Sequence, residues 1–333
     1  MFDVLTIGTA TRDVFLLSPA FKVLRDPKHL ESIGFPTGEA QCFALGAKID
    51  VGEPIFTIGG GATNAAVTFS RQGFKAATLI KIGNDERGNM VVASLKQDKV
   101  NVLAPRDSLH GTAYSTILLT SGGERTVLVY RGASENLAER DAPLKKLTSK
   151  WVYFVPGRIQ FGFIETLVHH FKKIGASVAM NPSRYYLGLG DKFRKLMKRL
   201  DVIVVNREEA SYLTGIDYKN ERAVFKKFDD LTPGIAVVTD GSRGARVSDG
   251  KYIYSAGIFK EKKLIDRTGA GDAFGSGFVA GLIHKNDIHH ALRVAAANAT
   301  SVVESIGAQS GILRERDLGS SRWKYLDLDI EPL

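Results

Sequence analysis

Residues 151–182 read WVYFVPGRIQFGFIETLVHHFKKIGASVAMNP, a stretch in which two apolar runs enclose a segment of helical periodicity. The runs WVYFVP and SVAMNP are typical of buried strands, and GFIETLVHHFKKIG is typical of a helix. The alternation continues with the predicted strands VIVVN and IAVVTD and the predicted helices DKFRKLMKRL and NERAVFKKFDDL. Near-continuous apolar strands that alternate with helices indicate a parallel sheet covered on both faces. We therefore expect an α/β fold with a doubly wound, mostly parallel sheet.

The first half of the chain extends this sheet and adds a smaller one. DVLTIG and ATLIKIG are predicted strands of the main sheet, on either side of the predicted helix GGATNAAVTFSRQ. Residues 14–58 and 111–130 lack this alternation, and the second stretch is typical of a hairpin that turns at residues 121–123. We expect both stretches to form a β-sheet lid over the carboxyl ends of the main strands, where open α/β sheets bind ligands. Residues 1–333 are expected to form a single domain.

Composition and charge exclude several classes of protein. The chain is 44% hydrophobic and 24% charged, and it has no apolar run long enough to cross a bilayer, so we expect no membrane partner. Its formal charge of +9 is spread in small groups of Lys and Arg without interleaved aromatic residues, which argues against a nucleic-acid partner. The start, MFDVLTIGTATRD, is typical of a strand, and the single Cys42 excludes an intramolecular disulfide. We therefore expect a cytoplasmic protein.

Residues 266–274, DRTGAGDAF, carry the strongest chemical signal. We expect a strand to end over residues 263–266 and a helix to begin at Asp272, so that the glycines stand at the turn between them. The free N–H groups and the dipole of a helix start attract an anion, which the small residues Gly269, Ala270 and Gly271 allow to approach. A carboxylate at Asp272 can take a proton from a hydroxyl that attacks this anion, which is phosphoryl-transfer chemistry. The alternative is that Asp272 is an ordinary helix N-cap.

Six further segments occur in a fixed order along almost the whole chain: GTATRD (8–13), GGGATNAA (59–66), GNDERG (83–88), NREE (206–209), TDGSRGA (239–245) and IGAQSG (306–311). Together with DRTGAGDAF they resemble the motifs of the ribokinase-like, or PfkB, family of sugar and nucleoside kinases. The resemblance implies a ribokinase-like fold, ATP as phosphoryl donor and Mg²⁺ as its companion ion. It also implies that Asp272 is the general base and that Gly269–Gly271 form the anion hole.

The resemblance also assigns binding roles. It implies that the sugar or nucleoside is bound by Asp13, Gly59, Gly60 and Asn64. The pair that holds Mg²⁺ and phosphates through water matches Asn206 and Glu209, although a helix cap explains the same pair and Glu208 competes with Glu209. The loop that contacts ATP matches Thr239, Gly241, Ser242 and Gly244, together with Gly271, although a plain hairpin turn explains the loop as well. Asp85 is expected to have a structural role, as a capping residue.

Many members of the family are activated by a monovalent cation. The positions that match their cation site, for which we expect K⁺, are Asp266, Thr268, Val302, Ser305, Gly307 and Gly311. Arg267 stands where the family usually has a small hydroxylated residue, and Gly311 where some members have a serine. K⁺ dependence and the role of Arg267 therefore stay open. A homodimer formed through the lid is a further expectation.

Three functions remain open at this point. The first is ATP-dependent phosphorylation of a hydroxyl of a sugar or sugar-like substrate. The second is an adenosine-type nucleoside kinase. A hydrophobic lid would favour a nucleoside, whereas contact with Arg131 would favour a sugar that carries a carboxylate or phosphate. The third is a sensor of sugars or nucleotides without catalysis, against which the intact Asp272 argues. The long segment 14–58 is expected to shape the acceptor pocket.

Overall fold

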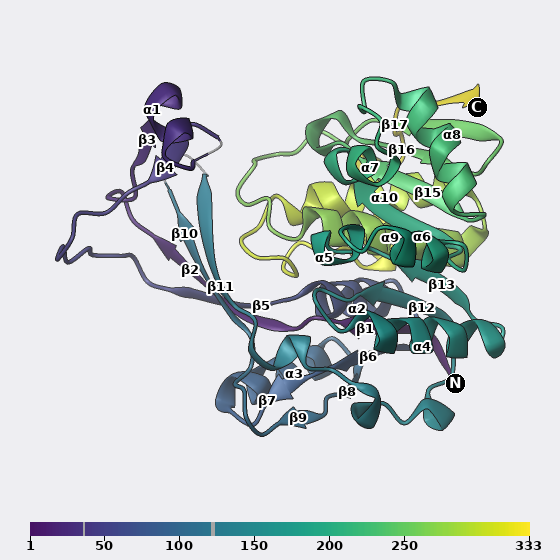
Figure 1. Cartoon of the computed structure of the whole chain (residues 1–333), viewed down its shortest axis with the longest axis horizontal. Coiled ribbons are helices and arrows are strands. Elements are labelled where there is room, and N and C mark those ends of the chain that lie inside the picture. The colour runs from purple at the N-terminus through teal and green to yellow at the C-terminus, as the bar shows by residue number, and fades with distance from the viewer. Residues whose placement is uncertain (36, 121–123) are drawn as a thin grey trace.

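A ten-stranded sheet runs through the body of the molecule in the structure, a computed structural model that describes residues 1–35, 37–120 and 124–333 (Figure 1). The strand order is β18-β17-β16-β15-β14-β13-β12-β1-β6-β8. Strands β8 to β15 of this order run parallel, and β16, β17 and β18 continue the sheet antiparallel. The predicted doubly wound, mostly parallel sheet is confirmed. Its strands are β1 (Phe2–Gly8), β6 (Ala76–Ile80), β8 (Asn101–Leu103), β12 (Ser149–Val155), β13 (Ser177–Met180), β14 (Val202–Asn206), β15 (Ile235–Thr239), β16 (Ala245–Ser248), β17 (Tyr252–Ala256) and β18 (Leu328–Pro332).

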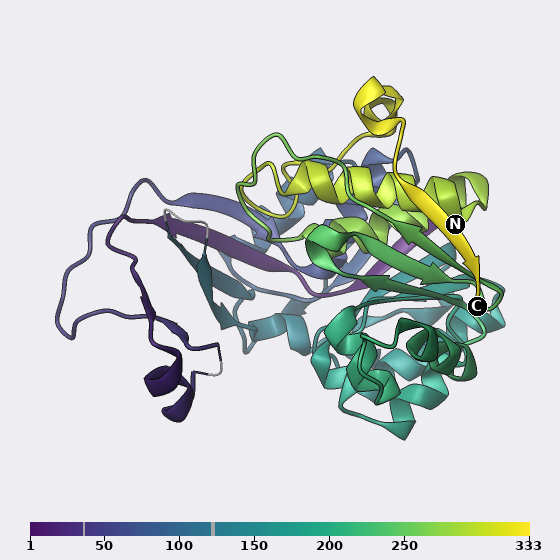
Figure 2. The same ribbon diagram turned by 90° about the horizontal axis from the view of Figure 1, so that it is seen from above.

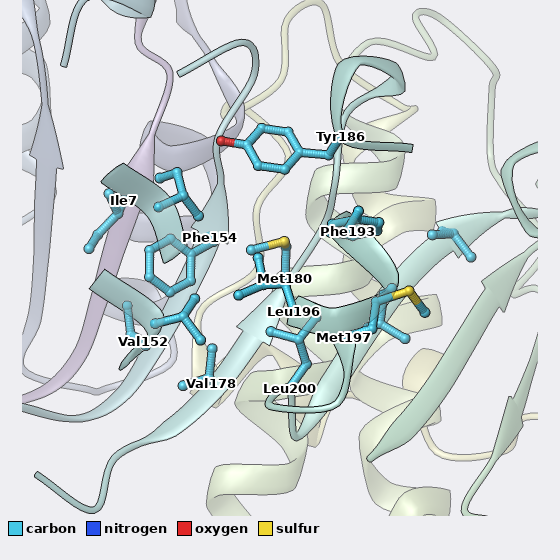
Figure 3. Packing of buried hydrophobic residues seen from close by; sticks show 14 of the residues in the cluster. Ile7, Val152, Phe154, Val178, Met180, Tyr186, Phe193, Leu196, Met197 and Leu200 are labelled. Carbon is cyan, nitrogen blue, oxygen red and sulfur yellow. The ribbon is translucent and has the colours of Figure 1, made fainter. Parts of the chain in front are cut away.

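Helices cover both faces of this sheet because successive strand residues point to opposite sides. Val4 of β1 belongs to one buried cluster and its neighbour Leu5 to another. The Val4 cluster is completed by α2, α9 and α10, and the Leu5 cluster by helices α4 to α8, as Figure 2 shows from above. In Figure 3, Met180 of the sheet lies between Phe154 of the neighbouring strand and Phe193 of α6. The helices are α2 (Gly61–Arg71), α3 (Glu86–Gln97), α4 (Phe161–Lys173), α5 (Arg184–Leu187), α6 (Asp191–Met197), α7 (Arg207–Thr214), α8 (Glu221–Leu231), α9 (Ala270–Lys285) and α10 (Ile288–Val302).

A separate four-stranded sheet, in the order β11-β10-β2-β5, extends away from the body (Figure 1). The predicted small sheet is therefore present, but it begins three residues earlier than residue 14, so that Asp13 lies inside β2. The predicted turn at residues 121–123 falls outside the described residues, while the strands on either side of it pair antiparallel. The strands of this sheet are β2 (Thr11–Leu17), β5 (Ile55–Gly59), β10 (Tyr114–Leu119) and β11 (Arg125–Tyr130). Besides six short 3-10 helices, the smaller elements in the described residues are β3 (Val23–Arg25), α1 (Pro27–Ser32), β4 (Glu39–Gln41), β7 (Ile82–Gly83) and β9 (Arg106–Asp107).

The strand predicted to end over residues 263–266 is absent from the described structure, and this prediction was wrong. The backbone N–H groups of Ile265 and Asp266 both donate to the carbonyl oxygen of Val303, at 2.8 and 3.2 Å. The segment therefore lies alongside the C-terminal end of α10 instead of joining a sheet. Helix α9 starts at Ala270, two residues before the predicted start.

Helices α9 and α10 pack unusually close to each other. A Cβ atom at Gly277 would stand 3.1 Å from Cα of Ala295, and one at Gly281 would stand 2.5 Å from Cα of Ala291. Glycine at these two positions lets the backbones approach, which places α10 beside the start of α9. Although α9 is buried along most of its length, none of the helices in the described ranges is long and apolar enough to span a bilayer.

Candidate active site

The start of helix α9 is shaped to receive an anion. Gly269 is its N-cap and has φ 81°, a left-handed conformation in which a Cβ atom would collide with Ala308. Around Gly271, by contrast, a Cβ atom would meet none of the described residues within 4 Å apart from the backbone of its own helix. The first helical N–H groups have no partner within the helix and carry the positive end of its dipole. The helix start thus combines donors, positive potential and open space.

Asp272 is the third residue of this helix and not its N-cap, so the capping alternative is excluded. Its Oδ2 accepts a hydrogen bond from Nδ2 of Asn64 at 2.8 Å. Its Oδ1 lies toward Gly61, 3.2 Å from where a Cβ atom of that residue would stand. Burial raises the pKa of the Asp272 carboxyl, and the bond from Asn64 opposes this shift. One oxygen is therefore held, and the carboxylate is more basic than an exposed one.

A second carboxylate, Asp13, lies at the other end of the turn formed by residues 59–61. Its Oδ1 accepts a hydrogen bond from Oγ1 of Thr11 at 2.8 Å, and a Cβ atom at Gly59 would collide with its Oδ2. Burial raises the pKa of the Asp13 carboxyl, and the hydrogen bond from Thr11 acts in the opposite direction. Residues 59–61 thus touch Asp13 at one end and Asp272 at the other. Gly60 between them has φ 98° and leaves no room for a side chain against Ala10.

A cavity of about 300 Å³ opens on the other side of the α9 start. The structure brings four of the predicted nucleotide residues and Gly271 together in its wall, and Arg267 lines it as well. Sequence reasoning missed the opposite wall, which is made by residues of α10 and its C-terminal end. The missed residues are Ala296, Ala299, Thr300 and Val303. Their spacing of three, four and seven places them on one helix face, and this run of mostly small residues was the available signal.

Asn206 and Glu209 form a reciprocal cap at the start of α7. Oδ1 of Asn206 accepts from the Glu209 N–H at 2.8 Å, and Oε2 of Glu209 accepts from the Asn206 N–H at 2.9 Å. Burial raises the pKa of the Glu209 carboxyl. Glu208 turns away and accepts a hydrogen bond from Arg207. The helix-cap explanation therefore describes this pair in the structure, and Glu209 rather than Glu208 is coupled to Asn206.

Comparisons with known proteins identify the family of the chain. Residues 29–315 match the family model described as pfkB family carbohydrate kinase, which is well over half of the chain. The chain belongs to this family. As a PfkB-family kinase, it is a phosphotransferase that uses ATP.

Relatives of this PfkB-family kinase act on different acceptors. The chain is 29% identical over 271 residues to a ribokinase of Haemophilus influenzae, a match that covers 76% of this chain and 83% of the relative. It is 24% identical over 257 residues to a cytidine kinase of Thermococcus kodakarensis, covering 75% and 88%. Among solved structures, a probable sugar kinase from Rhizobium etli superimposes with a TM-score of 0.78 at 23% identity, covering 95% of this chain and 97% of that one. The last likeness confirms the ribokinase-like fold.

Two loops of the kinase that were predicted to hold a monovalent cation meet at Asp266. Its Oδ1 accepts from the N–H and the hydroxyl of Thr268, at 3.0 and 2.7 Å, and its Oδ2 accepts from the Gly307 N–H at 3.1 Å. The carbonyl oxygen of Val302 accepts from the Ser305 N–H at 3.1 Å. The Asp266 carboxylate therefore holds the two loops together by accepting hydrogen bonds from both of them. The groups that the loops can offer to a cation are main-chain carbonyl oxygens.

The two departures from the family pattern lie in different surroundings. A Cβ atom at Gly311 would collide with the carbonyl oxygen of Ser301, so glycine lets this loop pass close to the end of α10. Arg267 is exposed at the wall of the cavity beside the start of α9.

Two other side chains have clear structural partners. Asp85 caps α3 through the Gly88 N–H at 2.9 Å and also accepts from the Thr112 N–H at 2.8 Å, which confirms its expected structural role. Burial alone would raise the pKa of Asp85, but the hydrogen bond from the Thr112 hydroxyl, together with those from the two N–H groups and from Arg87, lowers it to about 2. Arg131 forms an ion pair with Glu135 at 3.4 Å, so its charge is partly neutralised.

Proposed function

We propose that this kinase transfers the γ-phosphoryl group of ATP to a hydroxyl of a sugar or sugar-like substrate. The observation that carries the proposal is the position of Asp272 between the acceptor carboxylate Asp13 and the nucleotide cavity. A group that takes a proton must be within reach of both the attacking hydroxyl and the phosphorus. The turn at residues 59–61 and the open helix start at Gly271 supply those two approaches.

Each part of the site then has a task. Asp13 accepts hydrogen bonds from acceptor hydroxyls, with Gly59 and Gly60 leaving room for the substrate and Asn64 contributing its amide. Asp272 takes the proton from the attacking hydroxyl. The N–H groups at the start of α9 stabilise the charge that develops on the transferred group, with Gly269, Ala270 and Gly271 keeping that space open. The nucleotide is bound along Thr239, Gly241, Ser242 and Gly244, with Arg267 at a phosphate.

Glu209, with Asn206, is the proposed holder of a hydrated Mg²⁺. Within the cap, Oε1 of Glu209 is the carboxylate oxygen that accepts no hydrogen bond from the described residues. A single free carboxylate oxygen suits an ion that keeps most of its water and is bound together with phosphates. When bound, Mg²⁺ neutralises charge on the phosphates of ATP.

We also propose a K⁺ site at the loops joined by Asp266. The carbonyl oxygens of Asp266, Thr268 and Ser305 accept no hydrogen bond from the described residues and are available to a cation. Gly307 and Gly311 keep the second loop close to the first. Such a cation would order the segment that leads into α9, so turnover should rise when K⁺ is added.

The acceptor is tested most directly by an ATP-consumption screen over sugars, sugar acids, sugar phosphates and nucleosides, with and without K⁺. We expect turnover with a sugar or sugar-like acceptor. The relatedness to a cytidine kinase supports a nucleoside as the second candidate. ATP turnover with none of these compounds, together with ligand binding, would favour the non-catalytic sensor.

Gly59→Ala is expected to lower kcat/KM for the acceptor by about 10- to 100-fold, because the new methyl group displaces the Asp13 carboxylate. This range corresponds to loss of a hydrogen bond to a charged group, about 1.5–3 kcal/mol. KM for ATP should stay unchanged, since the cavity lies on the other side of α9. Steady-state kinetics with each substrate varied in turn measure both values. Gly162→Ala on α4, where a methyl group meets nothing within 4 Å, is the matched control. An unchanged acceptor kcat/KM in Gly59→Ala would remove Asp13 from the acceptor site.

We further propose that residues 1–333 act as one cytoplasmic kinase unit with the small sheet as its lid. Small molecules are its expected partners, without nucleic acid or membrane. A second copy is proposed to pair through the lid, because the edge strand β11 exposes Val127, Leu128 and Val129 at 43%, 56% and 49%. Light scattering should find a dimer that Leu128→Lys weakens and that Leu109→Lys, at an exposed site outside the small sheet, does not. A monomer at all concentrations would contradict the pairing.

A further inference from the structure

Gln309 lies behind Asn64, on the side away from Asp272. Its Nε2 donates to Oδ1 of Asn64 at 3.0 Å, and Nδ2 of Asn64 donates to Oδ2 of Asp272 at 2.8 Å. Both amide side chains are buried, with Gln309 9% and Asn64 3% exposed. Three segments that are far apart in sequence therefore form one short hydrogen-bonded row that ends at Asp272.

The direction of this row matters because an amide has two chemically different ends. Asn64 can present to Asp272 either its NH₂ group, which donates, or its oxygen, which only accepts. An ionised carboxylate is stabilised by a donor and destabilised by an acceptor oxygen at the same distance. The NH₂ group of Gln309 needs an acceptor, so it turns the oxygen of Asn64 toward itself and the NH₂ group toward Asp272.

The backbone that carries Gln309 is anchored to the helix that carries Asn64. The carbonyl oxygens of Gln309 and Ile312 accept hydrogen bonds from Nη1 of Arg71, at 2.8 and 3.1 Å. Arg71 stands seven residues after Asn64 on α2, and its guanidinium is held by Asp98 at 2.7 and 3.0 Å. Helix α2 thus fixes the distance between the two amides, and this favours a role for Gln309 in positioning the Asn64 amide.

We propose that Gln309 is a positioning residue for the base: by holding the Asn64 amide with its NH₂ toward Asp272, it keeps Oδ2 occupied and leaves Oδ1 for the acceptor hydroxyl. The inference rests on the proposed function, in which Asp272 takes the proton. It concerns a residue within the IGAQSG segment that touches neither the proposed acceptor nor the nucleotide cavity.

Gln309→Met and Gln309→Glu test this role. Methionine removes the donor at nearly constant volume, so we expect kcat to fall about tenfold, the effect of one hydrogen bond of ordinary strength. KM for ATP should not change. Glutamate offers oxygens where Gln309 offers NH₂, so it turns the NH₂ of Asn64 away from Asp272, and we expect the larger loss. In both variants the acidic limb of the kcat profile should move to higher pH, because a base that has lost its donor ionises less readily.

Gln72→Met is the matched control. Gln72 is fully buried and its Nε2 donates to the carbonyl oxygen of Leu313 at 2.9 Å, so it holds the same segment without touching Asn64 or Asp272. We expect this variant to melt at a lower temperature and to keep the wild-type pH profile. A wild-type pH profile in both Gln309 variants, with their activity following their melting temperature as in Gln72→Met, overturns the positioning role.

Asp272→Asn, measured in the same assay, separates this inference from the function on which it rests. Turnover by Asp272→Asn at the wild-type rate means that the proposed function fails. An inactive Asp272→Asn beside Gln309 variants with unchanged kcat and pH profile means that only the role of Gln309 fails.

Discussion

Asp272→Asn is expected to lower kcat by about 10²–10⁴-fold, the usual contribution of a general base, while ATP affinity stays nearly unchanged. The amide has almost the volume of the carboxylate but cannot take the proton of the attacking hydroxyl. The cavity proposed to bind the nucleotide is lined by the neighbouring residues Ala270 and Gly271 and not by Asp272. Single-turnover kinetics and calorimetric titration with ATP measure the two effects separately.

The same substitution should change stability in the opposite direction. Burial raises the folded-state pKa of Asp272 above that of the unfolded chain. The folded protein is therefore favoured at low pH, where Asp272 is protonated, and this contribution is lost as pH rises through the folded-state pKa. An asparagine carries no charge to desolvate, so Asp272→Asn should melt at a higher temperature than the wild type at neutral pH. The difference should shrink as the pH is lowered, which thermal denaturation over a pH series will measure.

Asp287→Asn is the control for both effects. Asp287 is the exposed N-cap of α10, a position at which asparagine caps equally well. We expect neither turnover nor the pH dependence of melting to change. Wild-type turnover in Asp272→Asn would remove the general base from the mechanism and leave α9 as a binding element only.

The fold was predictable from the sequence because its strands are buried on both faces. Runs such as VIVVN and IAVVTD point residues into the clusters on either side of the sheet, so they are apolar throughout and stand out from the helices. The strand prediction at residues 263–266 failed for a related reason. This segment donates its hydrogen bonds to the carbonyl oxygen of Val303, directly after α10, and no local pattern reveals a partner so far along the chain.

Candidate site residues could be proposed from the sequence where a residue type is needed for its own chemistry or for the space that it leaves. The glycines of residues 59–61 and 269–271 belong to this class, as does Asp272. Relations between segments were not predictable. Asn64 was expected to contact the acceptor, but its hydrogen bonds to Asp272 and Gln309 were not foreseen, because both join residues more than 200 positions apart. The α10 wall of the cavity beside α9 was missed because its small residues, although they share one helix face, indicate close helix packing as readily as a binding site.

Gly271→Ala is expected to lower kcat/KM for ATP by about 10²–10³-fold, as loss of one interaction with the developing charge does in other enzymes. Apart from its own helix backbone, a methyl group at this position meets none of the described residues within 4 Å, so it projects into the open space proposed for the phosphoryl group. The fold should not suffer, because Gly271 lies inside α9 and alanine is the better helix former by about 1 kcal/mol. Activity should therefore fall while the melting temperature stays equal or rises.

Gly269→Ala, two residues earlier, should not separate activity from stability. Its φ of 81° and the collision with Ala308 strain any side chain there, so this variant should lose stability and activity together. Thermal melting and ATP kinetics on both variants distinguish a distorted helix start from a blocked one. If Gly271→Ala turns over like the wild type, the phosphoryl group does not approach the start of α9, and the anion hole has to be sought elsewhere along the nucleotide cavity. If it is inactive but as stable as the wild type, the space in front of Gly271 is required for phosphoryl transfer and not for folding.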